Sequence, residues 1–271
     1  MKLDLETLKT ALSRNHLASK VRRNDSHFPM SESTPCRDLP CEIIVALDLP
    51  TREQALAVLD RLGDRPTRVK VGLQLFTRYG PALVEEIAAR GPHLFLDLKL
   101  HDIPNTVASA IRSLGHLPVD LLTIHGLGGP AMIERACEAR DEVGSTMKLL
   151  AVTVLTSMDD QQLSAVGVGG SPGEAAQRLA AMARQSRADG LVCSAHEVAG
   201  MRQNFGMEPL LVVPGIRPQG AATGDQKRIM TPGEAARLGA TSLVIGRPIV
   251  QADDPAEAYD RIAEEIASAP L

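Results

Sequence analysis

The segment EIIVALDLPTREQALAVLDRLGDRPTRVKVG (42–72) decides the fold class. It opens with an apolar run (42–49), continues with a stretch of helical character (52–63) and ends with a second apolar run (67–72). Continuous apolar runs rich in Val, Ile and Leu are typical of parallel strands that are covered on both faces. The segment therefore predicts a strand–helix–strand unit of an α/β protein.

The same alternation continues through the rest of the chain. Further apolar runs lie at 93–99, 120–126, 148–155, 190–195, 210–215 and 242–247, and further helical stretches lie at 75–90, 105–115, 129–141, 174–187, 195–204, 233–239 and 256–268. Eight strand–helix units in about 230 residues predict a TIM (β/α)8 barrel. A doubly wound sheet is the alternative, but Leu49-Pro50 occupies the turn in which that fold carries its glycine-rich motif.

Residues 1–40 do not share this pattern and are predicted to be a short N-terminal extension in front of a barrel domain at 41–271. Leucines at helical spacing indicate a short amphipathic helix near the start of the extension. The polar, proline-interrupted stretch NDSHFPMSESTP (24–35) then predicts a linker.

The composition excludes several classes of function. Hydrophobic residues make up 44% of the 271 residues, yet there are no Trp, two Tyr and four Phe, so the core must be aliphatic. Few aromatic residues and a net charge of -4 argue against a nucleic-acid partner, because such surfaces use stacking side chains and basic patches. No apolar run reaches the ~18 residues of a membrane span, so we expect no membrane partner.

Cysteine and aspartate positions do not form a metal-site pattern. The four cysteines lack CxxC or Cys/His ligand spacing and are interpreted as reduced thiols of a cytoplasmic protein. The pairs Asp159-Asp160 and Asp253-Asp254 stand where helices are predicted to start, and negative charge is favourable there. We therefore expect no metal ligands among them.

Polar side chains gather where the predicted strands end. The C-terminal ends of barrel strands carry the active site in this architecture, and polar residues are costly inside apolar strands. The residues at these ends are Asp48, Lys70, Asp97, Lys99, His125, Thr156, Cys193, Arg217, Gly246 and Arg247. His125 either lines the site or bonds a backbone carbonyl, whereas His101 is interpreted as a supporting or structural residue.

The densest stretch is DLKLHDIPNT (97–106). Asp97 and Lys99 are two positions apart, so both side chains point to the same face of a strand, which is the barrel interior. Lys70 would lie beside them. One interpretation is an ion-pair network that closes the barrel. The other is an acid–base array, in which a lysine held between carboxylates stays protonated as a proton donor and Asp97 repels a substrate carboxylate.

Two further motifs predict a phosphate site. VVPGIRP (212–218) and VIGRPI (244–249) place glycine and arginine after the seventh and eighth strands. Phosphate commonly binds at these two loops of a barrel. Glycine allows close approach of the backbone, and arginine makes bidentate charged contacts with phosphate.

Taken in order, these motifs resemble the orotidine 5′-phosphate decarboxylase family. The resemblance covers about residues 42–268. It is carried by the ordered motifs VALDLP (45–50), RVKVG (68–72), FLDLKLHDIPNT (95–106), VTVLTS (152–157), VVPGIR (212–217) and VIGRPI (244–249). The resemblance implies cofactor-free and metal-free decarboxylation of orotidine 5′-monophosphate to UMP and carbon dioxide in pyrimidine biosynthesis.

The resemblance also implies roles for individual residues. Lys99 would protonate C6 of the pyrimidine, and Asp97 would repel the substrate carboxylate. Lys70 would hold Asp97 and contact the ribose, and Asp48 would bind a ribose hydroxyl. In this family the position of Asp102 serves the active site of the partner subunit in a homodimer, so Asp102 is the fourth member of the array.

The remaining implied residues bind the substrate. Thr106 would also reach the partner's site, and Ile103 is a further substrate-binding position between the two. Thr156 and Gln226 would contact the base or close over it. The phosphate side would be formed by Pro214, Arg217, Gly246 and Arg247.

Three other functions stay open at the level of sequence. A 3-keto-gulonate 6-phosphate decarboxylase has a similar barrel and a similar Asp-x-Lys array, but it uses magnesium. A Schiff-base aldolase would use Lys99, although the neighbouring carboxylates would keep that amine protonated. A phosphate-ligand binding protein without activity would give no reason for the lysine–aspartate array.

Overall fold

Eight parallel strands follow one another around a closed barrel in chain order, and β8 pairs with β1. The computed structural model describes residues 41–218 and 230–269. In these ranges the predicted TIM barrel is confirmed, and the doubly wound alternative is wrong because an open sheet has two unpaired edges. The predicted extension at 1–40 lies outside the described residues, so it and its boundary remain predictions.

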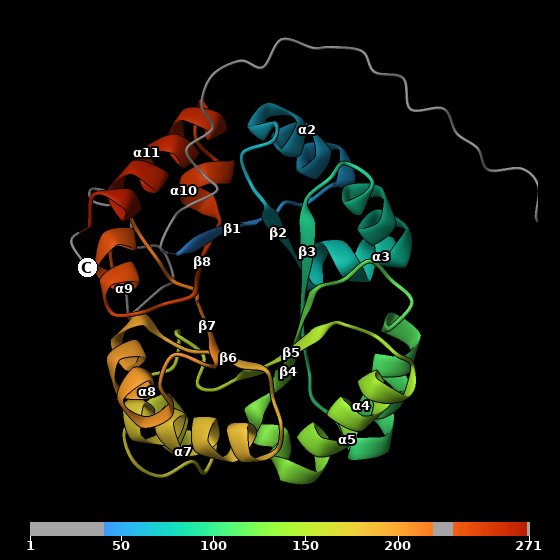
Figure 1. Ribbon diagram of the computed structural model, residues 1–271, viewed down its shortest axis with the longest axis vertical. Coiled ribbons are helices and arrows are strands. Elements are labelled where there is room, and N and C mark those ends of the chain that lie inside the picture. Colours follow the sequence, from blue (N-terminus) through green and yellow to red (C-terminus); the bar gives the residue numbers. More distant parts are fainter. Residues whose placement is uncertain (1–40, 219–229, 270–271) are drawn as a thin grey trace, which may run out of the picture. The chain divides into compact units, whose positions relative to one another are not determined.

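The strands are β1 (Glu42–Ala46), β2 (Arg68–Gly72), β3 (His93–Leu100), β4 (Leu121–His125), β5 (Lys148–Val152), β6 (Gly190–Val192), β7 (Leu210–Val213) and β8 (Ser242–Ile245). The helices are α2 (Arg52–Leu62), α3 (Leu73–Ala88), α4 (Pro104–Leu114), α5 (Gly129–Glu142), α6 (Asp160–Ala165), α7 (Pro172–Gln185), α8 (Val198–Phe205), α9 (Pro232–Arg237), α10 (Arg247–Val250) and α11 (Pro255–Ala267), with 3-10 turns η2 (Gly126–Gly128) and η3 (Ala195–Glu197). Figure 1 shows the helices as an outer ring around the strands.

Each strand and helix predicted for the barrel at 41–271 is present in the described residues, but several strands are shorter than predicted. β5 ends at Val152 and β6 at Val192. The short helices α6 and α10 were not predicted. Helix α3 leaves helical geometry at Gly80, whose φ of 62° suits glycine and which precedes Pro81.

Alternation along each strand divides the apolar side chains into two layers. In β1, Ile43 and Val45 pack outward in the larger cluster with the helices, whereas Ile44 and Ala46 face the barrel interior. The inner cluster contains Ile44, Ala46, Phe95, Leu121, Leu150, Val152, Val192, Val212 and Val244. The expected aliphatic core is therefore confirmed for the described residues, since Phe95 is the one aromatic member of this layer.

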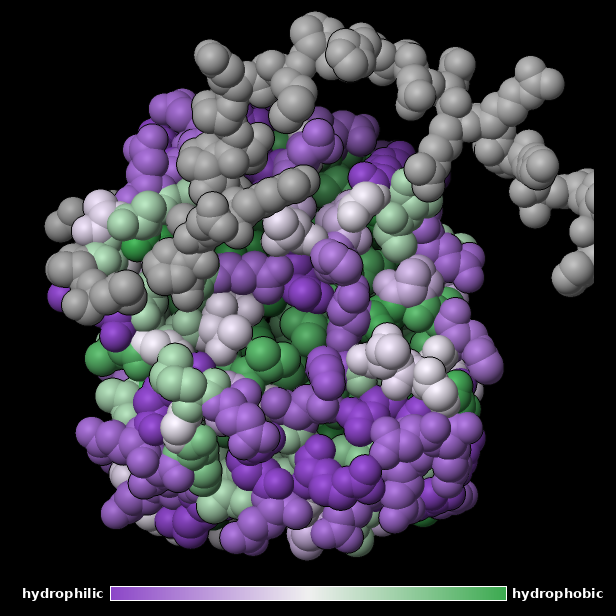
Figure 2. Space-filling model, in the orientation of Figure 1, coloured by the Kyte–Doolittle hydropathy of each residue, from purple (hydrophilic) through white to green (hydrophobic). Residues whose placement is uncertain are grey.

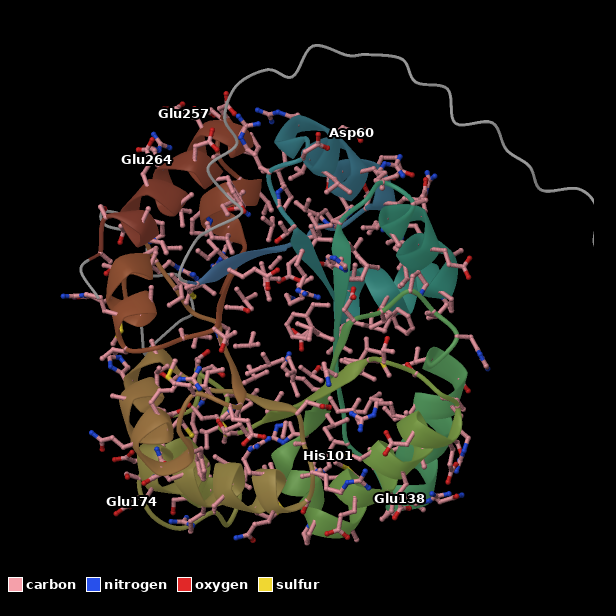
Figure 3. The ribbon with its side chains drawn as sticks, in the orientation of Figure 1. Asp60, His101, Glu138, Glu174, Glu257 and Glu264 are labelled. Carbon is pink, nitrogen blue, oxygen red and sulfur yellow. The ribbon has the colours of Figure 1, made fainter. Side chains whose placement is uncertain are left out.

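The outer helices carry hydrophilic side chains on their solvent-exposed faces. Figure 2 shows hydrophobic residues at the centre of the viewed face and hydrophilic residues around them. In Figure 3, side chains fill the space inside the ring of strands, and the labelled acidic residues lie exposed on the outer helices: Asp60, Glu138, Glu174, Glu257 and Glu264. Within the two described ranges, no helix is both long and apolar enough to cross a membrane.

Side-chain caps determine where several helices begin. Asp159 accepts a hydrogen bond from the backbone N–H of Gln162 at the start of α6, and Asp254 accepts from the first turn of α11. A cap of this kind contributes about 1 kcal/mol. The prediction that these two aspartates are helix-start charges is therefore confirmed.

Candidate active site

A cavity of about 500 Å³ opens at the C-terminal ends of the strands. Its floor is apolar and includes Phe95, Val152 and Val244 from the inner layer of the barrel. Nine of the residues predicted from the sequence line it: Asp48, Lys70, Asp97, Lys99, Thr156, Pro214, Arg217, Gly246 and Arg247. A cavity of this size is in the range of small-molecule sites.

Strand alternation places the charged residues in this cavity. Asp97 comes two positions after Phe95, and Lys70 lies beside Phe95 in the β2–β3 register, so these side chains share the interior face. Asp48 comes two positions after Ala46 in the same way. The layer directly above the apolar floor is therefore the first one that water and a ligand can reach.

The side chains form a chain of alternating charges. Lys70 Nζ lies 2.9 Å from Asp48 Oδ1 and 3.4 Å from Asp97 Oδ2. Lys99 Nζ donates to Asp97 Oδ1 at 2.8 Å. Asp97 is thus shared by two ammonium groups, and the order along the array is Asp48, Lys70, Asp97, Lys99. Lys99, whose side chain is 32% exposed, is the more accessible of the two lysines.

Burial and charge act in opposite directions on the inner pair. Burial by itself would lower the pKa of Lys70, but the carboxylates of Asp97 and Asp48 outweigh it, so the pKa of Lys70 is raised. Burial would also raise the pKa of Asp97, and attraction to Lys70 and Lys99 outweighs it, so the pKa of Asp97 is lowered. Both groups are therefore charged at neutral pH.

Gly72 makes room for this array, a role that was not predicted. A Cβ atom at position 72 would lie 2.8 Å from Asp48 Oδ1 and 3.0 Å from Lys70 Nζ, so a larger residue would require the ends of these two side chains to shift. The glycine ends the quoted motif RVKVG and stands two positions after Lys70. Its place on the interior face was the signal that could have identified it.

Thr123 is a second residue that was not predicted. It is fully buried on β4, and its hydroxyl donates to Asp97 Oδ1 at 2.9 Å. The same hydroxyl accepts a hydrogen bond from the backbone N–H of Lys99 at 2.8 Å. Because Thr123 precedes His125 by two positions, alternation along β4 could have indicated that it faces the site.

The opposite wall carries the two arginines. Arg217 follows β7, is 8% exposed, and donates from Nη1 to the carbonyl of Ile216 at 2.8 Å. Arg247 begins α10 directly after β8 and is exposed. Gly246 between β8 and α10 approaches Ala46, to which an added Cβ would come within 3.4 Å. The glycine–arginine pairs predicted from the sequence therefore face one cavity.

Three predicted residues in the described part of the chain do not line this cavity, and a fourth lies outside the described residues. Asp102, Ile103 and Thr106 lie exposed at the turn from β3 into α4, and Asp102 Oδ1 accepts from the N–H of Ile103 at 2.7 Å. Gln226 lies outside the described residues, so its predicted role is untested. The first three would have to act outside the cavity of their own subunit.

The two histidines near the site contact each other. Their rings stack with centroids 5.2 Å apart, and Figure 3 shows His101 displaced from the barrel centre toward α4 and α5. His125 Nδ1 accepts a hydrogen bond from the backbone N–H of Leu127 at 3.2 Å, a donor in η2. His125 therefore accepts from a backbone amide and does not line the cavity, so neither of its two sequence interpretations is correct.

Fold and site together define a (β/α)8-barrel protein with a buried lysine–aspartate array opposite two arginines. A model of the orotidine 5′-phosphate decarboxylase / HUMPS family matches residues 42–262, and the chain belongs to this family.

Relatives named orotidine 5′-phosphate decarboxylase match nearly along their full length. The one from Halorhodospira halophila is 50% identical over 230 residues, which is 85% of this chain and 98% of the relative. The one from Nitrosococcus oceani is 50% identical over 226 residues, 83% and 97% of the two chains. A crystal structure of orotidine 5′-phosphate decarboxylase from Lactobacillus acidophilus has a TM-score of 0.75 and 39% identity, and the match covers 84% of this chain and 100% of that one.

We expect His125 to make the fold sensitive to acid. Its pKa is lowered from 6.5 to about 4, first by burial and then by repulsion from His101 and Lys99. Between these two values the unfolded chain binds a proton that the folded chain does not, so stability falls as the pH falls through this window. His125→Asn keeps an acceptor for Leu127 but does not titrate, so its melting temperature should drop less between pH 7 and pH 4.5.

The matched control is His116→Asn, which changes an exposed histidine on the same barrel. It should keep the acid sensitivity of the unmodified protein. Equal pH slopes for the His125 variant and the unmodified protein would show that His125 does not carry the effect.

Proposed function

We propose that this protein decarboxylates orotidine 5′-monophosphate to UMP and carbon dioxide in pyrimidine biosynthesis. The observation that carries the proposal is the Asp97 carboxylate, which lies between two ammonium groups with Lys99 Nζ 2.8 Å away. Membership of the family and about 50% identity to relatives named for this activity support the same assignment.

The array suits this reaction chemically. A substrate carboxylate placed beside Asp97 meets a fixed negative charge, which favours its loss as carbon dioxide. The bond between C6 and the carboxyl carbon breaks, and its electron pair stays on C6. The ammonium of Lys99 stabilises this developing charge and then donates a proton to C6, after which Lys99 regains a proton from water. Atoms and charge balance without any other reactant.

The rest of the cavity fits the remainder of the nucleotide. In this proposal Asp48 and Lys70 contact the ribose, Thr156 and Pro214 border the base, and the arginine wall holds the phosphate. Phosphate lies far from the reacting carbon, so its binding energy serves to hold the carboxylate against Asp97. Gln226 retains its predicted role near the base.

We also propose a homodimer with shared active sites. Asp102 and Thr106 lie outside their own cavity, and the neighbouring Ile103 exposes 67% of its surface, which is unusual for a large apolar side chain. A second copy that covers this turn would bury Ile103 and bring Asp102 to its partner's array. The cytoplasm remains the proposed compartment, supported by the buried thiols of Cys41, Cys137 and Cys193.

Replacement of Lys99 tests the reaction. Lys99→Ala should retain the fold and lose at least about 10³-fold in kcat, because it removes both the proton donor and the electrostatic stabilisation of C6. The measurement is the loss of orotate absorbance after orotidine 5′-monophosphate is added, with and without excess EDTA.

Lys148→Ala is the matched control, since Lys148 begins β5 at the opposite end of the barrel. It should have unchanged activity. Full turnover by Lys99→Ala would contradict the proposed mechanism, and activity that is abolished by EDTA would favour the magnesium-dependent class of decarboxylase.

Replacement of Arg247 tests the phosphate site. Arg247→Ala should weaken the binding of UMP by about 10- to 100-fold, because a hydrogen bond to a charged group contributes about 1.5–3 kcal/mol. Binding of uridine, which lacks the phosphate, should change little. Calorimetric titration measures both ligands, and Arg261→Ala on the outer face of α11 is the control. Equal losses for UMP and uridine would rule out a phosphate role for Arg247.

A mixture of two inactive variants tests the shared site. If Asp102 serves the partner's site, a hybrid dimer of Lys99→Ala and Asp102→Ala contains one intact site and one doubly altered site. Random reassembly should then restore about one quarter of the unmodified activity. Each variant refolded alone is the control. No recovery from a mixture shown to contain hybrid dimers would place Asp102 in its own subunit's site or outside the mechanism.

A further inference from the structure

Strand β3 carries an irregularity at the point where it enters the active site. Its register against β4 runs from Leu96 opposite Leu122 to Leu100 opposite Ile124. Three residues of β3 therefore stand opposite one residue of β4, which is Thr123. Such bulges redirect side chains and interrupt the backbone hydrogen bonds of the ladder.

The backbone of Lys99 is strained within this bulge. Its φ is 50°, in the left-handed region that non-glycine residues rarely adopt. Conformations of this kind are unfavourable for non-glycine residues and persist where the surroundings impose them. Without the bulge, the N–H of Lys99 would bond to a backbone carbonyl of the neighbouring strand.

The hydroxyl of Thr123 takes the place of that carbonyl. Its Oγ1 accepts from the Lys99 N–H at 2.8 Å and donates to Asp97 Oδ1 at 2.9 Å. The Lys99 ammonium completes a closed ring, since Nζ bonds to the same Asp97 oxygen. Because the hydroxyl has a single proton, which points to Asp97, its lone pairs are available for the amide of Lys99.

We propose that Thr123 is a positioning residue for decarboxylation, whose hydroxyl holds the bulge of β3 so that Lys99 and Asp97 keep their mutual geometry. The inference rests on the proposed function for its kinetic consequence. Thr123 is fully buried and does not line the cavity, so it acts through Asp97 and Lys99 and not on the substrate.

The two hydrogen bonds of Thr123 require a hydroxyl group, and a side chain of the same shape without one cannot replace it. Valine has the shape of threonine but offers neither a donor nor an acceptor. With valine at position 123, the backbone N–H of Lys99 would lose its hydrogen-bond acceptor in a partly buried site. The backbone of Lys99 would then relax from its left-handed conformation. A displacement of about 1 Å at a reacting group can cost on the order of 100-fold in rate.

The test compares Thr123→Val, Thr123→Ser and Thr153→Val. Thr153 is a matched control, because it is also buried and its hydroxyl donates to the carbonyl of Val192, away from the array. Thr123→Val should lower kcat at least about tenfold. Its KM for orotidine 5′-monophosphate and its affinity for UMP should change less than about threefold, since phosphate and ribose contacts stay in place. Thr123→Ser should recover most of the rate, and Thr153→Val should keep it.

A second readout does not depend on activity. The backbone amide of Lys99, bonded to a buried hydroxyl, should exchange slowly with solvent deuterium in the unmodified protein and in Thr123→Ser, and at least about tenfold faster in Thr123→Val. Nuclear magnetic resonance of the full chain measures this amide directly.

The outcomes separate the two proposals. Unmodified kcat in Thr123→Val, equal losses in Thr123→Ser and Thr123→Val, or equal losses in Thr153→Val would each overturn the positioning role. An unmodified protein that does not decarboxylate orotidine 5′-monophosphate would instead contradict the proposed function, and the amide exchange of Lys99 would still decide whether Thr123 holds the bulge.

Discussion

The structure of the site depends on one shared carboxylate, that of Asp97. A buried charge without partners costs several kcal/mol, and Asp97 avoids this cost by accepting from Lys99 and Thr123 while Lys70 lies 3.4 Å away. Lys70 comes from β2 and Thr123 from β4, whereas Lys99 lies on β3 itself, two positions after Asp97. The barrel must therefore bring β2, β3 and β4 into register before the carboxylate can be ionised inside the protein.

The same requirement explains the less favourable features of the site. Lys99 adopts a left-handed backbone conformation, and a side chain at position 72 would displace the ends of Asp48 and Lys70. Both features oppose stability locally and serve the geometry of the charges. The aliphatic layers inside and outside the barrel supply the stability that permits them, since burial of apolar surface is the main favourable contribution to folding.

Among the described residues, the cavity proposed to bind a nucleotide has one aromatic side chain in its lining, Phe95. Phe95 belongs to the apolar floor, and the walls carry charged and small residues. Fixed charges then act above an apolar floor, where electrostatic interactions are stronger than in bulk solvent. The net charge of -4 conceals a local concentration of cationic groups made of Lys70, Lys99, Arg217 and Arg247.

The amino-acid sequence by itself determined the barrel and most of the residues that line the cavity. Alternation of apolar runs with helical stretches depends only on local spacing, and polar residues at strand ends can be read from the same spacing. Nine of the ten residues named at the predicted strand ends line one cavity. The contacts of Thr123 and Gly72 and the bulge at Lys99 are visible only in the three-dimensional structure. These depend on distances between atoms of neighbouring strands, such as the bond from Thr123 to Asp97 across 26 positions, and local spacing holds no information about such distances.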